Sequence, residues 1–209
     1  MIGDLVDEIE SLKKSETGEL VRERIKEFAA AGKRDSRHIF GELCFCILTA
    51  NFTAEKSIRI QEDIGRGFLT YSPEKLAARL KGLGHRFPNT RAGFIVSARE
   101  HEKGLKKTLA SFSDDKELRD WIVDNIKGLG MKEASHFMRN IGYKDVAIID
   151  FHIIDLLVRY GLISRPKTLT RKRYLLIEEV LEEIAQHTST TLAELDLYLW
   201  YQETGKILK

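Results

Sequence analysis

The sequence predicts an all-α protein with two helical lobes and a cleft between them. Apolar residues recur along almost the whole chain at intervals of three and four positions, the spacing of one helix face, and the alternation typical of strands is almost absent. Only three prolines interrupt the 209 residues, so long helices are allowed. A hydrophobic fraction of 43% and a charged fraction of 32% fit a soluble globular protein with a sizeable core.

The first half of the chain is expected to contain six helices. Residues 39–49 are apolar nearly all round, so this helix is expected to be buried. Ser72 followed by Pro73 is typical of a helix start, with serine as the N-cap and proline at the first helical position. Asn89 or Thr90 is expected to cap the helix after that. The expected helices cover 4–14, 19–31, 39–49, 53–68, a short segment from 73, and 91–104.

The second half of the chain is expected to add five helices, for a total of about ten or eleven. No low-complexity linker divides the sequence, so the lobes are expected to be built from segments that return to one another. We expect one lobe to comprise residues 35–142 and the other to comprise residues 1–34 together with 143–209. The five expected helices cover 114–126, 132–141, 151–160, 171–186 and 192–204.

A Gly-Leu-Gly turn between two helical patterns is the most informative motif. Gly128 and Gly130 allow a sharp turn with no side chain at its tip, so the first N–H groups of the next helix point outward beside the positive end of its dipole. Such a helix start can bind a DNA phosphate. A plain corner between two helices uses glycine just as readily, and residues 81–84 repeat the same letters, which predicts a second corner there.

A lysine and an aspartate follow the turn. Lys132 lies in the first turn of its helix, where the dipole disfavours a cation and so favours the neutral, nucleophilic amine. Asp150 interrupts an apolar run, and a carboxylate in such surroundings needs a reason. Asp150 could be present only to cap the next helix. Lys132 could likewise be an ordinary surface lysine with a solvated charge. Capping and catalysis are compatible, because a capping carboxylate can direct one oxygen into a cleft.

These motifs resemble the helix-hairpin-helix DNA glycosylase superfamily over about half of the chain. Residues 126–163 match its order of Gly-Leu-Gly-x-Lys, an apolar run that ends in Asp, and a helix with Arg and Gly near its end. Residues 79–99 resemble the stretch that carries a wedge residue, and residues 48–51 resemble the site of a gap-filling polar side chain. The short, all-helical chain, the lack of cluster cysteines and the final lysine resemble the compact, archaeal-type 8-oxoguanine DNA glycosylase/AP lyases.

This resemblance implies the roles of four residues. Lys132 would attack C1′ of the deoxyribose and form a Schiff base, and Asp150 would stabilise the positive charge that develops on the sugar. Phe87 would wedge into the DNA stack, and Pro88 favours an extended conformation that would present its ring stiffly. Asn51 would fill the space left by the extruded base. A core position for Phe87 and an N-cap position for Asn51 are the alternatives.

The resemblance also implies that Lys209 and Trp200 recognise the base. N7 of 8-oxoguanine carries a hydrogen and donates it, whereas N7 of guanine is an acceptor. The carboxylate of Lys209, the last residue of the sequence, would therefore accept from the lesion and repel normal guanine. Trp200 would stack on the extruded base. A frayed chain end and ordinary core packing are the respective alternatives.

The expected partner is double-stranded DNA that contains oxidised guanine, bound by a monomer that has no contact with membranes. We expect no cofactor, because the proposed chemistry needs neither a redox group nor a metal. Cys44 and Cys46 are too few for a four-cysteine iron–sulfur or zinc site and are expected to be small core residues. A cytoplasmic location is expected, since the sequence has no signal pattern and no apolar run of membrane-spanning length.

Two other functions remain open from the sequence. An endonuclease III-like glycosylase/lyase for oxidised pyrimidines would use the same chemistry, although the missing cluster cysteines argue against it. A non-catalytic helix-hairpin-helix module would bind DNA without chemistry. The presence of both Lys132 and Asp150 argues against the module.

Overall fold

The computed structural model describes residues 2–209 and is built from helices joined by short turns. Within this part of the chain there is no strand, so the all-α prediction is confirmed. The elements are α1 (Ile2–Lys13), α2 (Glu16–Gly32), α3 (Ser36–Thr49), α4 (Ala54–Ile64), α5 (Gly67–Thr70), α6 (Pro73–Gly82), α7 (Pro88–Ala98), the 3₁₀ helix η1 (Arg99–Gly104), α8 (Leu105–Leu109), α9 (Asp115–Asn125), α10 (Met131–Asn140), α11 (Phe151–Arg159), α12 (Arg171–His187) and α13 (Leu192–Thr204).

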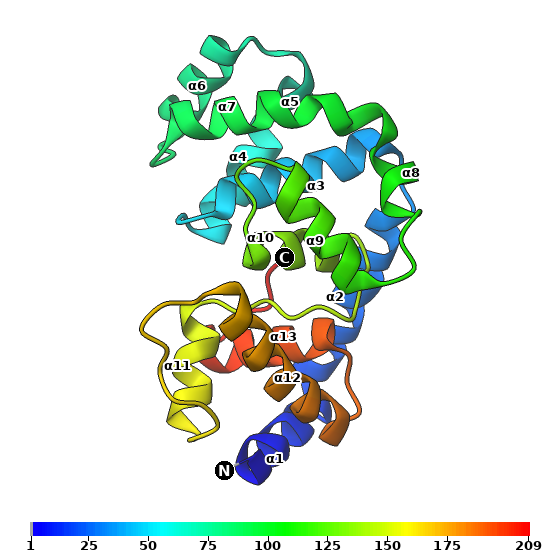
Figure 1. Ribbon diagram of the computed structural model, residues 1–209, viewed down its shortest axis with the longest axis vertical. Helices are drawn as coiled ribbons and strands as arrows, with labels where there is room; N and C mark the ends of the chain where they lie inside the picture. Colours follow the sequence, from blue (N-terminus) through cyan, green and yellow to red (C-terminus); the bar gives the residue numbers. More distant parts are fainter. Residues whose placement is uncertain (1) are drawn as a thin grey trace.

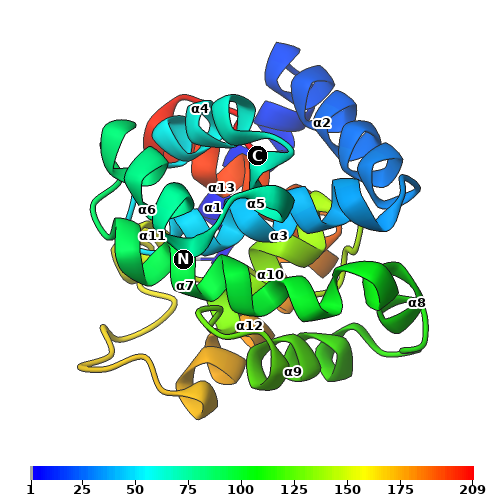
Figure 2. The ribbon, with the colours of Figure 1, turned by 90° about the horizontal axis from the view of Figure 1, so that it is seen from above.

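The helices form two groups, one above the other in Figure 1. The upper group contains α3 to α10, and the lower group contains α1, α11, α12 and α13. Helix α2 runs along one side from the lower group to the upper one, and the C-terminal segment turns back between them (Figure 1). Seen from above, α9 lies over α12, so these two helices face each other across the boundary (Figure 2).

Two separate apolar clusters stabilise the two groups. One cluster runs from Ile39 to Val146, and the other combines residues between Leu5 and Phe28 with residues from Ala147 onward. Helix α3 is fully buried along residues 43–48, as its uninterrupted apolar sequence predicts. The lobe boundaries at 34/35 and 142/143 stay a prediction, and the change of cluster between Val146 and Ala147 is the observation that favours them.

Several helix boundaries differ from those expected. Helix α7 begins at Pro88, with Phe87 as its N-cap, so the expected cap at Asn89 or Thr90 is wrong. Proline has no N–H and a fixed φ, which suits the first helical position, and this preference outweighs the capping ability of the polar residues that follow. The expected helix 53–68 is divided into α4 and α5 because Gly65 adopts a φ of +47°.

The expected helix 91–104 is also divided, and the helix after it was not expected. The α-helical part ends at Ala98, and residues 99–104 continue as the 3₁₀ helix η1. Helix α8 follows directly as a single short turn of five residues. Within residues 2–209 the structure therefore has thirteen α-helices and one 3₁₀ helix, more than the ten or eleven expected. Short helices of this length carry too few residues for a periodic pattern to be visible.

No helix in the described part of the chain is both long and apolar enough to cross a membrane.

Among the ion pairs that join α9 to α12, two differ strongly in burial. Arg119 Nη1 and Nη2 donate to the two carboxylate oxygens of Glu178 at 2.5 and 2.8 Å, and both side chains are buried. Lys116 Nζ lies 2.6 Å from Glu182 Oε1, with 44% and 33% of the two side chains exposed. Because water screens the second pair and cannot reach the first, the two pairs should differ strongly in their effect on stability.

Replacing Arg119 by methionine is therefore expected to lower the free energy of unfolding by about 3–5 kcal/mol, because it leaves the buried Glu178 charge without its partner. Lys116→Met is the matched control on the same helix and should lower it by less than about 1 kcal/mol. Urea unfolding followed by circular dichroism measures both values. Equal, small losses in the two variants would contradict the importance of the buried pair.

Candidate active site

One large cavity lies where the two groups of helices meet and has a volume of about 540 Å³. Its walls come from the turn between α3 and α4, from α10, from the segment that leads into α11, from α13 and from the C-terminal residues. Five residues predicted from the sequence line it: Asn51, Lys132, Asp150, Trp200 and Lys209. Three others are not part of its lining: Phe87, Gly128 and Gly130.

Lys132 is the second residue of α10, so its position in the first helical turn is confirmed. Its Nζ lies 3.1 Å from Glu133 Oε1, and 28% of the lysine side chain is exposed. The other oxygen of Glu133 accepts a hydrogen bond from the Gly130 N–H at 3.3 Å. Glu133 was not predicted, although an acid three residues after a helix N-cap is a common capping pattern. The Glu133 carboxylate therefore holds the Lys132 amine at the cavity wall and also accepts the hydrogen bond of a free N–H group at the start of α10.

Asp150 is the N-cap of α11, as expected. Its Oδ1 accepts a hydrogen bond from the Ile153 N–H at 3.0 Å, and the residue also lines the cavity. A carboxylate at this end of a helix is stabilised by the helix dipole. Asp150 is therefore a negative charge that lines the same cavity as Lys132.

The Gly-Leu-Gly turn forms a tight corner between α9 and α10. Gly128 has a φ of +96°, and a Cβ atom there would collide with the ring of Phe94. Leu129 is buried beneath the turn, and Gly130 is the N-cap of α10. In the similar sequence at 81–84 the positive φ falls on Gly84, the second glycine, so the two corners have different geometry. The use of the first corner as a phosphate site stays a prediction, since the Gly130 N–H already donates to Glu133.

The structure excludes the alternative positions considered for two residues, a core position for Phe87 and an N-cap position for Asn51. Phe87 is 37% exposed, so it is not a core phenylalanine, and the Arg86 and Arg91 guanidinium groups lie 5.0 and 6.0 Å from its ring centre. Asn51 is exposed and has a φ of +58°, a left-handed conformation that asparagine tolerates well. The N-cap of α4 is Thr53, so the capping alternative for Asn51 is wrong.

A buried histidine links the segments that carry these two residues. His85 Nδ1 accepts a hydrogen bond from the Phe87 N–H at 3.0 Å, and His85 Nε2 lies 3.0 Å from the Leu48 carbonyl oxygen. The first bond requires a bare Nδ1, so the proton lies on Nε2 and is donated to that carbonyl. Burial lowers the pKa of His85 and favours this neutral form. The sequence offered no signal for this link because the partners are 37 positions apart.

Lys209 is held firmly rather than frayed. Its Nζ donates to the two oxygens of Glu42 at 3.0 and 3.2 Å and to Gln61 Oε1 at 2.5 Å, and it lies 4.7 Å from the ring centre of Phe45. The main chain of Lys209 hydrogen-bonds to His136. The partner Glu42 was not predicted, but a lone acid in the buried helix α3 was a signal that a cation had to reach it.

Aromatic rings and a second carboxylate complete the walls. The ring of Trp200 meets that of His152 edge-on, with centroids 5.1 Å apart. Asp196 pairs with Arg139, and both side chains are buried. Burial raises the pKa of Asp196 to about 6, with the Arg139 charge acting against this shift and the nearby Asp150 charge adding to it. Neither Asp196 nor Arg139 was predicted from the sequence.

No group of three or more His, Cys, Asp or Glu side chains is arranged to hold a metal ion anywhere in residues 2–209. Cys44 and Cys46 are free and buried in the core of α3, as expected. Burial raises the pKa of both thiols, so they are poor nucleophiles.

The family model for 8-oxoguanine DNA glycosylase, of the helix-hairpin-helix type, matches residues 21–190 of this chain. The chain belongs to this family. The predicted resemblance is thereby confirmed at the level of the family.

Two curated relatives are similar along their whole lengths. The 8-oxoguanine DNA glycosylase/AP lyase of Korarchaeum cryptofilum is 53% identical over 209 residues, which is 100% of this chain and 99% of that protein. The protein of the same description from Methanocaldococcus jannaschii is 52% identical over 206 residues, 98% of this chain and 99% of the relative.

Solved structures of the family superpose closely on this fold. The crystal structure of the Methanocaldococcus jannaschii 8-oxoguanine glycosylase/lyase in complex with 15mer DNA containing 8-oxoguanine gives a TM-score of 0.95 at 51% identity, covering 98% of this chain and 99% of that one. The 8-oxoguanine DNA glycosylase of Thermotoga maritima gives a TM-score of 0.93 at 42% identity, covering 100% of both chains. The two-lobed helical architecture is therefore that of the family.

His136 is expected to make this glycosylase-family fold sensitive to acid. The half-buried ring lines the cavity, and burial, helped by the charges of Arg139, Lys132 and Lys209, lowers its pKa well below 6.5. Below pH 6.5 the histidine takes up a proton in the unfolded chain but not in the folded one. The free energy of unfolding therefore decreases as the pH is lowered, by at most about 1.4 kcal/mol per pH unit.

The test compares urea unfolding at about pH 7 and pH 5.5, on either side of the ordinary histidine pKa. His136→Gln cannot titrate and should lose less stability on acidification than the wild type. His187→Gln, at a position where 55% of the side chain is exposed, should behave like the wild type. The same pH dependence in wild type and His136→Gln would show that the His136 ring plays no part.

Proposed function

We propose that this protein is a base-excision-repair DNA glycosylase/AP lyase that excises 8-oxoguanine from double-stranded DNA and cuts the strand by β-elimination. The observation that carries this proposal is that Lys132, in the first turn of the hairpin's second helix, and Asp150, a helix-capping carboxylate, line one cavity. The relatives that are 53% and 52% identical over nearly the whole chain are described as enzymes with both activities.

The proposed reaction begins with the amine of Lys132 as nucleophile. The neutral amine attacks C1′ of the extruded nucleotide, the bond from C1′ to the base breaks, and the base leaves with its electron pair and takes up a proton. The fixed charge of Asp150 stabilises the positive charge that develops on the sugar. Opening of the sugar ring gives a Schiff base on Lys132. Loss of a proton from C2′ then expels the 3′ phosphate, and water releases the lysine.

Recognition of the lesion is assigned to the C-terminal part of the cavity. The side chain of Lys209 is held by Glu42 and Gln61 and its main chain by His136, which supports the proposal that its carboxylate accepts the N7 hydrogen of 8-oxoguanine. Trp200 lines the cavity and meets His152 edge-on, which supports the proposal that it stacks on the base. A carboxylate in this place would repel the bare N7 of guanine, which gives the site its selectivity.

Extrusion of the base is assigned to residues outside and at the rim of the cavity. Removing a base from the stack costs a few kcal/mol, and apolar wedges and gap fillers offset part of this. Phe87 is exposed beside the exposed Arg86, whose guanidinium can contact phosphates, and Asn51 lines the cavity. Gly128 and Gly130 give the hairpin its tight turn for approach to the DNA backbone. We expect a monomer that acts inside the cell, where its DNA substrate is.

Lys132→Gln is expected to abolish the covalent adduct that borohydride traps on a duplex with a single 8-oxoguanine, because it removes the amine that forms the Schiff base. DNA binding, measured by fluorescence anisotropy, should be retained. Lys206→Gln is the control: it removes a second cavity lysine, paired with Glu55, and the adduct should persist. An adduct that survives in Lys132→Gln would assign the nucleophile elsewhere. An adduct in the wild type only on oxidised pyrimidines or a bare abasic site would replace the substrate, and no adduct on any duplex would leave a DNA-binding module.

One glycine appended after Lys209 is expected to impair excision of 8-oxoguanine strongly, because it moves the terminal carboxylate away from its place beside His136. Cleavage of a duplex with a preformed abasic site should change little, since no base has to be recognised there. Gel assays of the two substrates under single-turnover conditions separate the effects. Unchanged excision by the extended protein would remove the terminal carboxylate from the recognition site.

A further inference from the structure

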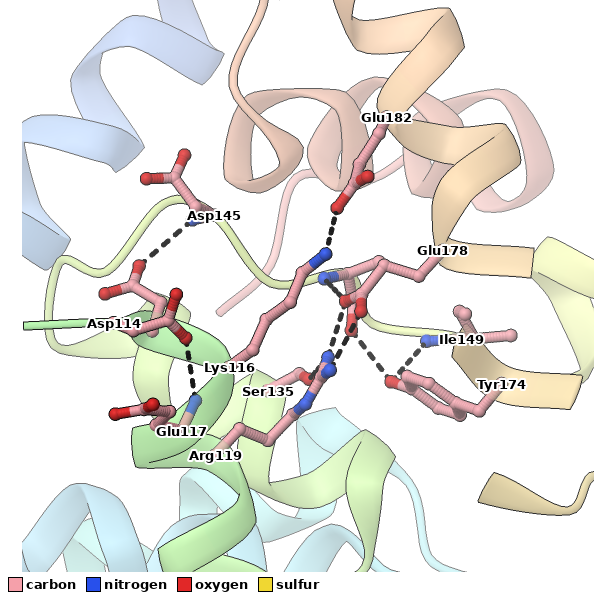
Figure 3. A network of polar contacts seen from close by, with 12 residues as sticks. Asp114, Lys116, Glu117, Arg119, Ser135, Asp145, Ile149, Tyr174, Glu178 and Glu182 are labelled. Carbon is pink, nitrogen blue, oxygen red and sulfur yellow. Dashed lines mark hydrogen bonds and ion pairs between the residues drawn. The ribbon is translucent and has the colours of Figure 1, made fainter. Parts of the chain in front are cut away.

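A buried polar network lies between α9, α10 and α12, behind the cavity wall rather than on it (Figure 3). Arg119 donates two hydrogen bonds to Glu178, and its Nη1 also lies 3.4 Å from Ser135 Oγ. Arg119, Ser135 and Glu178 have no exposed surface, and Tyr174 is 2% exposed. The ion pair between Arg119 and Glu178 joins the two groups of helices. The network also makes further hydrogen bonds that are not needed for this purpose.

Those remaining bonds go to the backbone that leads into Asp150. Glu178 Oε1 accepts from the Ala147 N–H at 2.7 Å. The Tyr174 hydroxyl donates to the Ala147 carbonyl oxygen at 2.7 Å and accepts from the Ile149 N–H at 3.2 Å (Figure 3). Residues 146–150 belong to no helix, so the fixed side chains of α12 take the place of the regular pairing that a helix would supply.

The same network also touches the helix that carries the nucleophile. Ser135 lies three residues after Lys132 on α10, which places the two on neighbouring positions of one helix face. One rigid group of side chains therefore contacts both the helix of Lys132 and the segment that ends at Asp150. Neither Tyr174 nor Glu178 lines the cavity, so they can act on the reaction only through other residues.

We propose that Tyr174 and Glu178 are positioning residues for the reaction: by holding the backbone of Ala147 and Ile149, they set the place of the Asp150 carboxylate relative to Lys132. This inference rests on the proposed function, in which those two groups act on the same sugar. A displacement of about 1 Å at a reacting group can slow a reaction by a factor of about 100. The cap bond to Ile153 orients the carboxylate within α11, and the network fixes where that helix begins.

Tyr174→Phe tests the proposal with little disturbance, since it keeps the ring in the core and removes only the hydroxyl. The rate of excision at saturating enzyme, measured in single turnover, should fall about tenfold, as expected for a modest displacement of a reacting group. The dissociation constant for a duplex that carries a non-cleavable abasic analogue should stay within about twofold, because the cavity lining and the hairpin are untouched. A loss confined to the rate separates positioning from general damage to the fold.

Tyr198→Phe is the matched control. Tyr198 lies on α13, is 3% exposed in the same apolar cluster as Tyr174, and lies outside the cavity lining. This variant should excise at the wild-type rate. If both variants lose the same fraction of rate, or if the rate of Tyr174→Phe falls in step with its DNA affinity, the network is only structural and the proposal is overturned.

A double-mutant cycle decides whether Tyr174 acts through Asp150. Single-turnover rates are measured over hours for Asp150→Asn and for Asp150→Asn with Tyr174→Phe. The second change should add nothing once the carboxylate is gone, whereas an independent effect would multiply the two losses. Multiplied losses overturn the proposal. Wild-type protein without activity on either an 8-oxoguanine or an abasic duplex would overturn the proposed function itself, while an active wild type with an unaffected Tyr174→Phe variant would overturn only this inference.

Discussion

The cavity exists only while the two groups of helices keep their relative position, and the pair between Arg119 and Glu178 is buried at the boundary they share. A guanidinium offers two parallel N–H groups to a carboxylate, so this bond fixes an orientation as well as a distance. Charges removed from water are strongly penalised when they lose their partner, so sliding of α9 over α12 is opposed at every displacement. Lys132 and Asp150 come from opposite sides of this boundary and depend on it for their spacing.

The cations that line the cavity are paired before DNA arrives. Each lysine or arginine of the lining has a carboxylate partner: Lys132 with Glu133, Arg139 with Asp196, Lys206 with Glu55 and Lys209 with Glu42. A paired cation attracts a phosphate only weakly. The cavity is therefore suited to a neutral base and a sugar, while attraction for the DNA backbone has to come from the outer surface, where Arg86 lies beside Phe87. This division fits a net charge of only +2.

Local patterns in the sequence were enough to predict the helices, the buried α3, the helix start at Ser72, the cap at Asp150 and the place of Lys132. Each depends on residues within one or two turns of one another. The missed features join distant positions: Glu42 with Lys209 is 167 residues apart, and Arg119 with Glu178 is 59 apart. Their partners follow from the packing of the helices, which no local pattern contains.

The buried pair at the boundary also responds to heat differently from the apolar clusters on either side of it. Hydration of ions becomes less favourable as temperature rises, so the penalty for keeping Arg119 and Glu178 away from water shrinks, whereas the apolar contribution per unit area levels off. Warming should therefore strengthen the joint relative to the clusters on either side of it. With this buried pair at the boundary, the two sides of the cavity should keep their relative position almost until the protein unfolds. The activity should therefore increase with temperature and then be lost abruptly at the unfolding temperature.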